Sequence, residues 1–526
     1  MSAYAHGQGK PASLGLSASA QAAGLQAGDP SPLAKADQLY RTGKLAAAAQ
    51  EYNALLQAEP KSALAYVGLV HVYLKQKKPA EAYAAAAKAV ELAPSLAAAR
   101  VALGEAYFRQ GKIDEANAEF TALAKANTKE PRAYLGLSRV YGALSYFKHA
   151  KLAIDRAHAL DPADPDIRKA WIRTLNLKER IKDLQAYLGS ETNDDQEERK
   201  NLEHMRVMLT DQADQPTHGC RLATKISAME TNLEPLLTDP THIRGYGLRV
   251  KVNGVSSKLM LDTGAGGITV DRRIADKAGI KRVVRQDSEG VGDKGPAAGY
   301  IGYADSIKIG DIEFQNCYVD VIEQSSVVGE DGLIGGDVFS HFLLDIDFPN
   351  QKFRLHELPP RPDPPAPARS PESNSSGTPE FYDPYIAPEM KSFSQVLRLG
   401  SHLLIPTKLN DLPPKLFMLD TGAFANTISP EAAREVTKVS SEEGAQIRGI
   451  SGAVKNVFTA NEFTIRFANL RQKNQDTFAF DTSSISNSLG TEVSGFLGFN
   501  MLRMLRIRID YRDGLIDFEY DSKRFH

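Results

Sequence analysis

The sequence predicts a multidomain protein in which an all-α solenoid of helical repeats is followed by two all-β lobes. Three observations support this prediction: a 34-residue periodicity in the first part, a change to short alternating strands after about Cys220, and one phrase that occurs twice. That phrase, Leu-Asp-Thr-Gly-Ala, begins at Leu261 and again at Leu419. Because 526 residues are too many for a single hydrophobic core, we expect about three domains.

The composition of the chain argues against two classes of function, nucleic-acid binding and membrane binding. The formal net charge is −2, so the totals favour neither a nucleic-acid surface nor a membrane-binding face. We find no apolar run long enough to span a bilayer, and residues 1–30 lack the continuous apolar segment of a signal peptide, so they are predicted to be a disordered tail. Partners are therefore expected to be proteins or peptides. The sequence does not indicate the cellular compartment of the protein. The alternatives are the cytoplasm and, if the start is misassigned, the periplasm or the exterior.

The periodic region resembles tetratricopeptide (TPR) repeats. A small residue, an aromatic residue and a proline recur in one frame, as in the four alanines Ala48, Ala82, Ala116 and Ala150. The resemblance implies four helical hairpins over residues 31–165, each burying one face against its neighbour. Such a solenoid has a groove that docks a peptide or a partner protein, and a structural spacer without a ligand is the alternative. Residues 166–217 are predicted to form a helical cap and connector.

The second half is predicted to hold two β units separated by a linker. Short segments alternate apolar and polar residues between turn residues, first over residues 218–358 and then over residues 390–526. The intervening segment 359–389 is rich in proline and serine and cannot build a core. Cys220 and Cys317 are expected to be two core thiols, and pairing between them is the alternative.

The order of motifs repeats between the two β units. Asp262 is followed by "DGLIGGDVF" and "LDIDF", and Asp420 is followed by "SGFLGFNML" and "RIDYR". This ordered set resembles the retropepsin-like aspartic proteases, and the resemblance covers nearly the whole second half. It implies two lobes of one aspartic endopeptidase that arose by duplication. Asp345 and Asp347 of "LDIDF" are better explained by strand alternation than as a metal pair.

The chemistry explains why the phrase occurs twice. Peptide hydrolysis without a metal or a covalent intermediate needs one carboxylate to deprotonate a water and one carboxyl to protonate the carbonyl oxygen. Each lobe supplies one such group, so Asp262 and Asp420 are the expected catalytic dyad, and no metal or other cofactor is expected. The resemblance assigns supporting roles to the rest of both phrases, namely Thr263, Gly264, Thr421 and Gly422.

Two glycine-rich segments correspond to the flaps that close over substrate in this family. They are Glu289–Gly302, which contains Gly290 and Gly292, and Arg448–Phe458, which contains Gly449 and Gly452. Pepsin-like sites commonly carry a serine after Asp-Thr-Gly, whereas this chain has Ala265 and Ala423. Without those hydroxyl groups the dyad is expected to hold its shared proton to higher pH, which predicts activity in mild acid.

The sequence therefore favours an aspartic-type endopeptidase whose TPR region recruits a substrate or partner. Two alternatives remain: a peptide-binding scaffold that does not cleave, and lobes that each form a homodimeric protease site. The recruitment hypothesis predicts that a chain without the solenoid still cleaves short peptides. The natural substrate, the cleavage preference and the TPR ligand are not indicated by the sequence.

Overall fold

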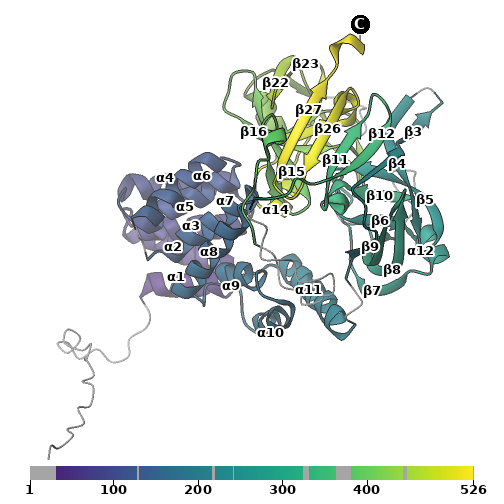
Figure 1. The fold of residues 1–526 in the computed structure, drawn as a ribbon. Helices are drawn as coiled ribbons and strands as arrows, with labels where there is room; N and C mark the ends of the chain where they lie inside the picture. The colour runs from purple at the N-terminus through teal and green to yellow at the C-terminus, as the bar shows by residue number, and fades with distance from the viewer. Residues whose placement is uncertain are drawn as a thin grey trace, which may run out of the picture.

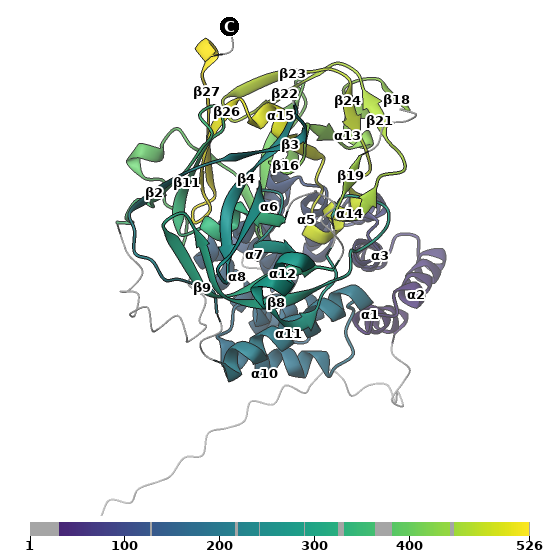
Figure 2. The same ribbon diagram turned by 90° about the vertical axis from the view of Figure 1, so that its right-hand side faces the viewer.

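A computed structural model describes residues 31–126, 129–215, 219–240, 242–288, 290–323, 331–362, 381–441 and 447–524. The predicted tail 1–30, residues 363–380 of the predicted linker and Glu289 of the first predicted flap lie outside the described residues. The helical region and the two β lobes stand side by side (Figures 1 and 2). Within the described residues, no helix combines the length and the apolarity that a membrane span requires.

The solenoid consists of helical hairpins, in agreement with the 34-residue periodicity. Its helices are α1 (Pro32–Arg41), α2 (Leu45–Ala58), α3 (Ala63–Lys75), α4 (Pro79–Leu92), α5 (Ala97–Arg109), α6 (Ile113–Lys125), α7 (Pro131–Ala143) and α8 (Phe147–Leu160). The repeated alanines Ala48, Ala82 and Ala116 are fully buried. Glycine is needed where helices cross, because a Cβ at Gly68 would lie 2.2 Å from the Tyr52 ring.

Three connector helices continue the array: α9 (Pro165–Ile172), α10 (Leu177–Leu188) and α11 (Gln196–Asp214). They bring acidic residues to the solenoid face formed by the first helix of each hairpin. Lys75 of α3 lies 3.1 Å from Asp166 and 3.2 Å from Glu198. Buried Arg132 of α7 pairs with Glu105 at 3.0 Å and with Asp164 at 2.8 Å. This part of the predicted groove is therefore filled by the chain's own ion pairs.

Lobe 1 is an open, mostly antiparallel sheet with one short helix. Its elements are β1 (Arg221–Leu222), β2 (Ala228–Asn232), β3 (Glu234–Asp239), β4 (His242–Val252), β5 (Val255–Asp262), β6 (Ile268–Asp271), α12 (Arg272–Ala278), β7 (Lys281–Arg285), β8 (Gly299–Ile309), β9 (Ile312–Ile322), β10 (Gly332–Gly335), the 3-10 turn η1 (Gly336–Phe339), β11 (Phe342–Asp347) and β12 (Lys352–Glu357). Among the described residues, nine of these strands form one sheet with the central order β6-β10-β5-β4-β8.

Lobe 2 repeats that arrangement. Its elements are η3 (Pro388–Met390), β13 (Ser394–Gln395), β14 (Leu397–Leu399), β15 (His402–Leu409), β16 (Lys415–Asp420), β17 (Thr427–Ile428), α13 (Pro430–Arg434), β18 (Val439–Ser441), β19 (Arg448–Gly449), β20 (Gly452–Ala453), β21 (Phe458–Ala460), β22 (Phe463–Phe467), β23 (Leu470–Asn474), β24 (Thr477–Ala479), α14 (Ser483–Leu489), β25 (Gly495–Gly498), α15 (Phe499–Leu502), β26 (Leu505–Asp510), β27 (Leu515–Tyr520) and η4 (Ser522–Arg524). The order β17-β25-β16-β15-β22 corresponds to β6-β10-β5-β4-β8 of lobe 1.

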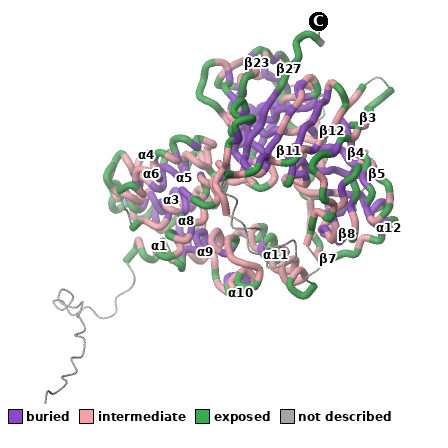
Figure 3. The backbone as a smooth tube through the Cα atoms, in the orientation of Figure 1, coloured by how far each residue is buried: buried purple, intermediate pink, exposed green. Residues whose placement is uncertain are grey.

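A third sheet joins the lobes. Among the described residues its strand order is β13-β27-β26-β11-β12-β2, so each lobe contributes three strands. The two lobes meet where β11 pairs with β26, with Leu344 opposite Ile509 and Ile346 opposite Ile507. All four of these side chains are fully buried. Figure 3 shows buried residues, in purple, through both β lobes. The lobes therefore share one hydrophobic core.

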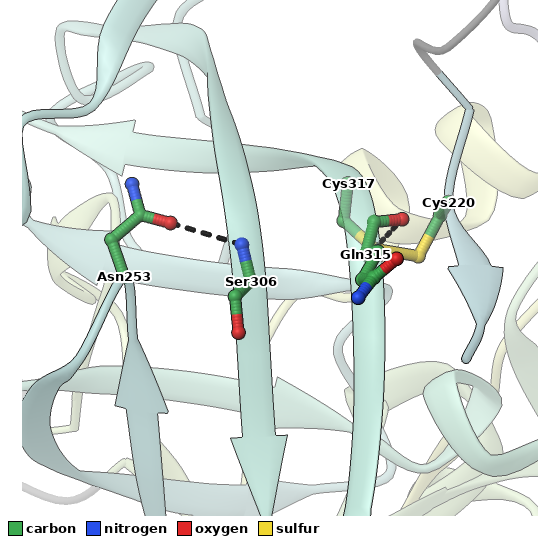
Figure 4. The surroundings of a disulfide bond; sticks show 5 residues. All are labelled: Cys220, Asn253, Ser306, Gln315 and Cys317. Atoms are coloured by element: carbon green, nitrogen blue, oxygen red, sulfur yellow. Dashed lines mark hydrogen bonds between the residues drawn. A yellow bond between two sulfur atoms is a disulfide. The ribbon is translucent and has the colours of Figure 1, made fainter. Parts of the chain in front are cut away.

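The two cysteines form a disulfide, so the expectation of two free core thiols is wrong. Cys220 lies just before β1, and β1 adds to the edge of the lobe 1 sheet by pairing with β9, which contains Cys317. Arg221 stands opposite Gln315, and this register brings the two sulfur atoms together (Figure 4). The bond links the start of lobe 1, just after α11, to the middle of strand β9 near the edge of the sheet.

The solenoid packs firmly against lobe 2. Ile113 and Leu137 of the solenoid share an apolar cluster with Leu416, Val493 and Phe496 of lobe 2. The backbones also meet, because the amide of Glu492 donates to the carbonyl of Arg109 at 3.0 Å. In addition, the hydroxyl of Thr491 donates to the carbonyl of Phe108 at 2.7 Å. The side of the solenoid next to lobe 2 is therefore an internal interface (Figure 1).

The described flanks of the predicted linker also pack against the folded parts. Arg361 pairs with buried Asp513, and its guanidinium lies 4.1 Å from the centre of the Tyr382 ring. On the solenoid, the amide of Lys148 donates to the carbonyl of Tyr382 at 2.9 Å. The segment is thus anchored at both described ends, which a proline- and serine-rich composition alone does not predict.

Candidate active site

Asp262 and Asp420 stand at the ends of equivalent strands. Asp262 ends β5, where it pairs in parallel with Gly335 of β10, and Asp420 ends β16, where it pairs with Gly498 of β25. The run of apolar residues before each aspartate forms the buried strand that carries it. In both lobes the chain turns directly after the aspartate through Thr-Gly-Ala.

The two turns approach each other so closely that each glycine contacts the aspartate of the other lobe. A Cβ on Gly264 would lie 2.6 Å from the carboxyl carbon of Asp420, and a Cβ on Gly422 would lie 2.4 Å from an oxygen of Asp262. Both positions therefore need glycine, because a side chain would displace the carboxyl group. The structure brings the two predicted aspartates together in one place.

Thr263 and Thr421 cross-link the two turns below the carboxyl groups. The hydroxyl of Thr263 donates to the carbonyl of Leu419 at 2.9 Å, and the hydroxyl of Thr421 donates to the carbonyl of Leu261 at 2.8 Å. Each hydroxyl also accepts from the other threonine's backbone amide, at 3.0 and 3.1 Å. Both threonines are almost completely buried, so these four hydrogen bonds fix the separation of the lobes at the site.

The electrostatics of the pair favour one shared proton. Burial, followed by the negative charge of Asp420, raises the pKa of Asp262 well above its usual range. Burial also raises the pKa of Asp420, but hydrogen bonds to its charged form oppose that shift. Asp420 accepts the backbone amides of Ala423 at 2.8 Å and Gly422 at 2.9 Å. Two adjacent buried carboxyls cannot both ionise easily, so the pair favours a state with one proton and one negative charge.

Further residues hold the turns, and the sequence indicated only some of them. Asp337 of η1 accepts the amide of Gly267 at 2.9 Å. In lobe 2, the side-chain oxygen of Asn426 accepts the amide of Gly498 at 2.8 Å. Asn500 acts through its backbone amide, which donates to the carbonyl of Phe424 at 2.9 Å. Asp337 and Asn500 lie within the repeated segments "DGLIGGDVF" and "SGFLGFNML", whereas Asn426 carries no pattern that distinguishes it.

The two glycine-rich segments meet each other. The amide of Gly290 donates to the hydroxyl of Ser451 at 3.1 Å, and the amide of Ser451 donates to the carbonyl of Val291 at 3.1 Å. A Cβ on Gly292 would lie 2.4 Å from the backbone of Ser451, and one on Gly449 would lie 2.5 Å from the carbonyl oxygen of Val291. Gly452, which begins β20 directly after the turn from β19, has a φ of +90°. Ser451 was not expected to be the central residue of this contact.

Apolar side chains line both sides of the pair in matching positions. In lobe 1, Met260 and Leu333 form a small cluster against which Ala265 and Ile450 pack. In lobe 2, the equivalent positions are Met418 and Phe496, in the cluster against which Ala423 and Val291 pack. Thus each cluster contains one residue from the glycine-rich segment of the opposite lobe, Ile450 on one side and Val291 on the other.

Asp345 and Asp347 serve the interlobe sheet. Asp345 pairs with Arg506 of lobe 2 at 2.7 Å, and Asp347 pairs with Arg354 at 3.2 Å. Both carboxylates are thus neutralised by arginine. Across the described parts of the chain, no group of three or more histidine, cysteine, aspartate or glutamate side chains is arranged to hold a metal ion.

Family models of known proteins match both parts of this architecture. The family model described as aspartyl protease matches residues 248–338 and 405–501, one stretch in each lobe. Models described as tetratricopeptide repeat match residues 33–97 and 73–140. A solved structure, the aspartic proteinase from Irpex lacteus, aligns with 56% of this chain and 98% of its own length, at 11% identity and a TM-score of 0.34.

Curated relatives match over a short stretch only. The protein named DnaJ homolog subfamily C member 3 is 32% identical over 93 residues in Bos taurus and 31% identical over 93 residues in Homo sapiens. The match covers 18% of this chain and 18% of each relative, so the chain spans less than a fifth of their length. The three family models and the two matching sheets lead to one conclusion: the chain combines N-terminal tetratricopeptide repeats with two aspartic protease-like lobes.

Proposed function

We propose that the protein is an aspartic endopeptidase that hydrolyses peptide bonds at an intramolecular dyad of Asp262 and Asp420. One observation carries this proposal: each aspartate lies against the Thr-Gly turn of the other lobe, with four threonine hydrogen bonds fixing the two turns. A protein that only binds peptides does not need two buried carboxyls held together, since that arrangement costs stability.

The proposed reaction uses a pair of carboxyls that holds one proton and one negative charge. The Asp420 carboxylate takes a proton from a water, and the water oxygen bonds to the carbonyl carbon of the scissile peptide. Asp262 donates its proton to the carbonyl oxygen, which gives a neutral gem-diol. Collapse of that intermediate breaks the C–N bond, a carboxyl proton passes to the leaving nitrogen, and an acid and an amine are released.

The glycine-rich segments support a role as flaps. They carry few side chains, meet through backbone hydrogen bonds, and place Val291 and Ile450 beside the apolar residues near the dyad. An extended peptide lying beneath them would be shielded from water, which strengthens the electrostatic interactions in the site. The apolar residues on both sides favour apolar side chains next to the scissile bond.

The solenoid is proposed to bring a protein substrate or partner to this site. TPR repeats commonly bind proteins, but the face next to lobe 2 is already used within the chain. The inner face near α9 and α11 is filled by ion pairs such as Lys75–Glu198 and Arg132–Glu105. A partner would therefore use the rest of the solenoid surface, or displace those ion pairs.

The direct test is cleavage of a peptide library by the purified full-length protein, with and without pepstatin, from acid to neutral pH. Pepstatin-sensitive cleavage in mild acid, absent in both Asp262→Asn and Asp420→Asn, is the expected result. A correctly folded protein that binds pepstatin but cleaves nothing would favour the scaffold alternative instead.

A further inference from the structure

The helix α11 lies between the solenoid and lobe 1 and contacts both (Figure 1). Its N-terminal end lies on the solenoid, where Lys77 pairs with Glu197 at 3.5 Å. The chain just before the helix also touches the solenoid, since a Cβ on Gly43, in the turn between α1 and α2, would lie 2.8 Å from the carbonyl oxygen of Thr192. This end of α11 is therefore held by the first two helical hairpins.

The rest of α11 lies on lobe 1. The hydroxyl of Tyr318 on β9 donates to the carboxylate of Asp211 at 2.6 Å, and Lys200 pairs with Asp287 at 2.9 Å. Asp287 follows β7 and lies just before the glycine-rich segment of lobe 1. The helix therefore links the solenoid to the part of lobe 1 that leads into a proposed flap.

The disulfide strengthens a contact that is otherwise weak. The side chain of Lys200 is 48% exposed and that of Asp287 is 23% exposed, and an ion pair so open to water contributes little stability. The strand β1, which follows α11 along the chain, has only two residues. Cys220 precedes β1, and Cys317 is the neighbour of Tyr318 on β9. The covalent bond is therefore the strongest of these connections between the end of α11 and lobe 1.

One of the two sulfur atoms is accessible in the folded protein. Cys220 is exposed, whereas Cys317 is only 2% exposed (Figure 4). An open cavity of about 600 Å³ lies beside Cys220, between α11 and lobe 1. Its lining includes Met205, Met208 and Leu209 of α11 and Gln286 and Tyr318 of lobe 1. Because thiol–disulfide exchange requires access to one sulfur only, a thiol reductant can attack Cys220 without unfolding of the lobe.

We propose that the Cys220–Cys317 disulfide is a reducible site that clamps α11 onto lobe 1 when it is oxidised and releases the helix when it is reduced. The reactant that this site takes is a dithiol. The proposal goes beyond the proposed cleavage and does not depend on it.

The exchange needs no reactant besides the dithiol. A thiolate of the dithiol attacks Sγ of Cys220, the S–S bond breaks, and the sulfur of Cys317 leaves as a thiolate that takes a proton. The second thiol of the dithiol then attacks the reductant's own sulfur in the mixed disulfide, and Cys220 leaves and is protonated. Two electrons and two protons thus pass from the dithiol to the two cysteines, and the dithiol becomes a disulfide.

The first test is reduction of the native full-length protein at neutral pH, followed by alkylation with iodoacetamide and mass spectrometry. Both cysteines should take the label after treatment with a dithiol, and neither without it, while the circular dichroism spectrum stays native. The probes are dithiothreitol and reduced thioredoxin. Labelling after dithiothreitol alone assigns the site to a small dithiol, and labelling after both assigns it to a protein dithiol as well. Cysteines that stay unlabelled until the protein unfolds would overturn the proposal.

The second test is hydrogen exchange of the oxidised and the reduced protein, followed by mass spectrometry. In the reduced protein the backbone amides of α11 should exchange about tenfold faster or more, because local opening of the helix becomes easier, whereas β26 of the interlobe sheet should stay as protected as before. Unchanged exchange in α11 would contradict the clamp. An equal increase in β26 would mean that reduction loosens the whole fold, which would also contradict it.

Substitutions separate the disulfide from the contacts around it. The double variant Cys220→Ser with Cys317→Ser should show the fast exchange of α11 without any reductant and should not respond to dithiothreitol. Tyr318→Phe is the matched control, since it removes the hydrogen bond to Asp211 but keeps the disulfide, so α11 should stay more protected than in the double variant. A folded double variant whose α11 exchanges as slowly as in the oxidised wild type would overturn the proposal. If the double variant does not fold, reduction of the native protein decides the question.

Discussion

Asp262 is the residue at which the proposed catalysis and the stability of the fold are in conflict. Its pKa is raised because the carboxyl is buried and lies beside Asp420. A carboxyl whose pKa is higher in the folded state costs no stability below its unfolded pKa. The cost grows as the pH rises from that value through the folded pKa, and it is fully present above both. The native protein therefore carries a stability penalty at neutral pH.

Asp262→Asn should accordingly raise the melting temperature at neutral pH while abolishing cleavage. In strong acid, where the native carboxyl is protonated, the two proteins should melt at nearly the same temperature. Thermal unfolding followed by circular dichroism across this pH range measures the difference. Asp347→Asn is the control of opposite sign, because hydrogen bonds from Asn350 and Arg354 outweigh burial and lower the pKa of Asp347. A variant Asp262→Asn that is less stable than the wild type at neutral pH would contradict the assignment.

The threonine hydroxyls offer a matched pair of substitutions. Thr421→Val removes the donor to the Leu261 carbonyl and the acceptor of the Thr263 amide, leaving buried groups unpaired. The expected loss is about 2–4 kcal/mol of unfolding free energy, measured by denaturant titration. Thr427→Val is the control, since the Thr427 hydroxyl oxygen is buried and unpartnered among the described residues and should cost little. Equal losses in the two variants would mean that the threonine cross-link contributes no specific stability.

The disulfide is a contact between two single residues that the sequence alone did not predict. Cys220 and Cys317 are 97 positions apart, and nothing around either one distinguishes a core thiol from half of a disulfide. Their pairing depends on the short strand β1 joining the edge of β9, a contact too brief to leave a pattern. Disulfides persist mainly in oxidising compartments, so the bond is relevant to where this protein functions.

At the scale of elements, the two segments proposed as flaps depend on backbone that only glycine permits. Gly292 has a φ of +132°, and a Cβ there would lie 2.4 Å from the backbone of Ser451. Gly292→Ala should separate the two segments and raise KM by about tenfold, with a smaller change in the unfolding free energy. Gly254→Ala is the control, because Gly254 has a φ of +81° in open space. Steady-state kinetics on a short peptide measure KM for both variants. Identical KM values in Gly292→Ala and Gly254→Ala would contradict the proposed role of the two segments as flaps.

Elements with a strong repeat were predictable from the sequence, and single contacts were not. The hairpins follow from alanines in a 34-residue frame, and the strands β5 and β16 follow from apolar runs leading into Asp262 and Asp420. Ser451, in contrast, lies in a glycine-rich turn whose partner is another turn in a different lobe. Such contacts depend on how the two lobes pack against each other, so the local sequence pattern does not predict them.

At the scale of the whole molecule, the solenoid packs against lobe 2 and supports it, whereas the sequence predicted a region that only recruits a substrate or partner. The apolar residues Leu416, Val493 and Phe496 match an ordinary lobe core in the sequence, but they share a cluster with α6 and α7. Gly111 illustrates the closeness, since a Cβ there would lie 3.3 Å from Leu416 and 3.4 Å from the carbonyl oxygen of Glu492. The solenoid and lobe 2 therefore share an apolar interface, which the sequence pattern did not indicate.

A chain lacking residues 31–165 should consequently lose cleavage of short peptides, because lobe 2 would expose this apolar face. We expect increased binding of a hydrophobic dye, a lower melting temperature and a tendency to aggregate relative to the full chain. If the truncated chain instead stays folded and cleaves short peptides at the wild-type rate, the solenoid is a separable recruitment module, as the sequence alone favoured.

The central claim is that one catalytic site forms within one chain, and mixing two inactive variants tests it most directly. Purified Asp262→Asn and Asp420→Asn proteins are assayed separately and after co-incubation, on the same pepstatin-sensitive peptide, with the double variant as the background. The interlobe sheet and the threonine cross-link join the two lobes of a single chain, so each variant should lose activity by about a thousandfold or more, and the mixture should recover nothing. Substantial residual cleavage in either single variant, or recovery of activity on mixing, would show that sites form between chains and would contradict the account.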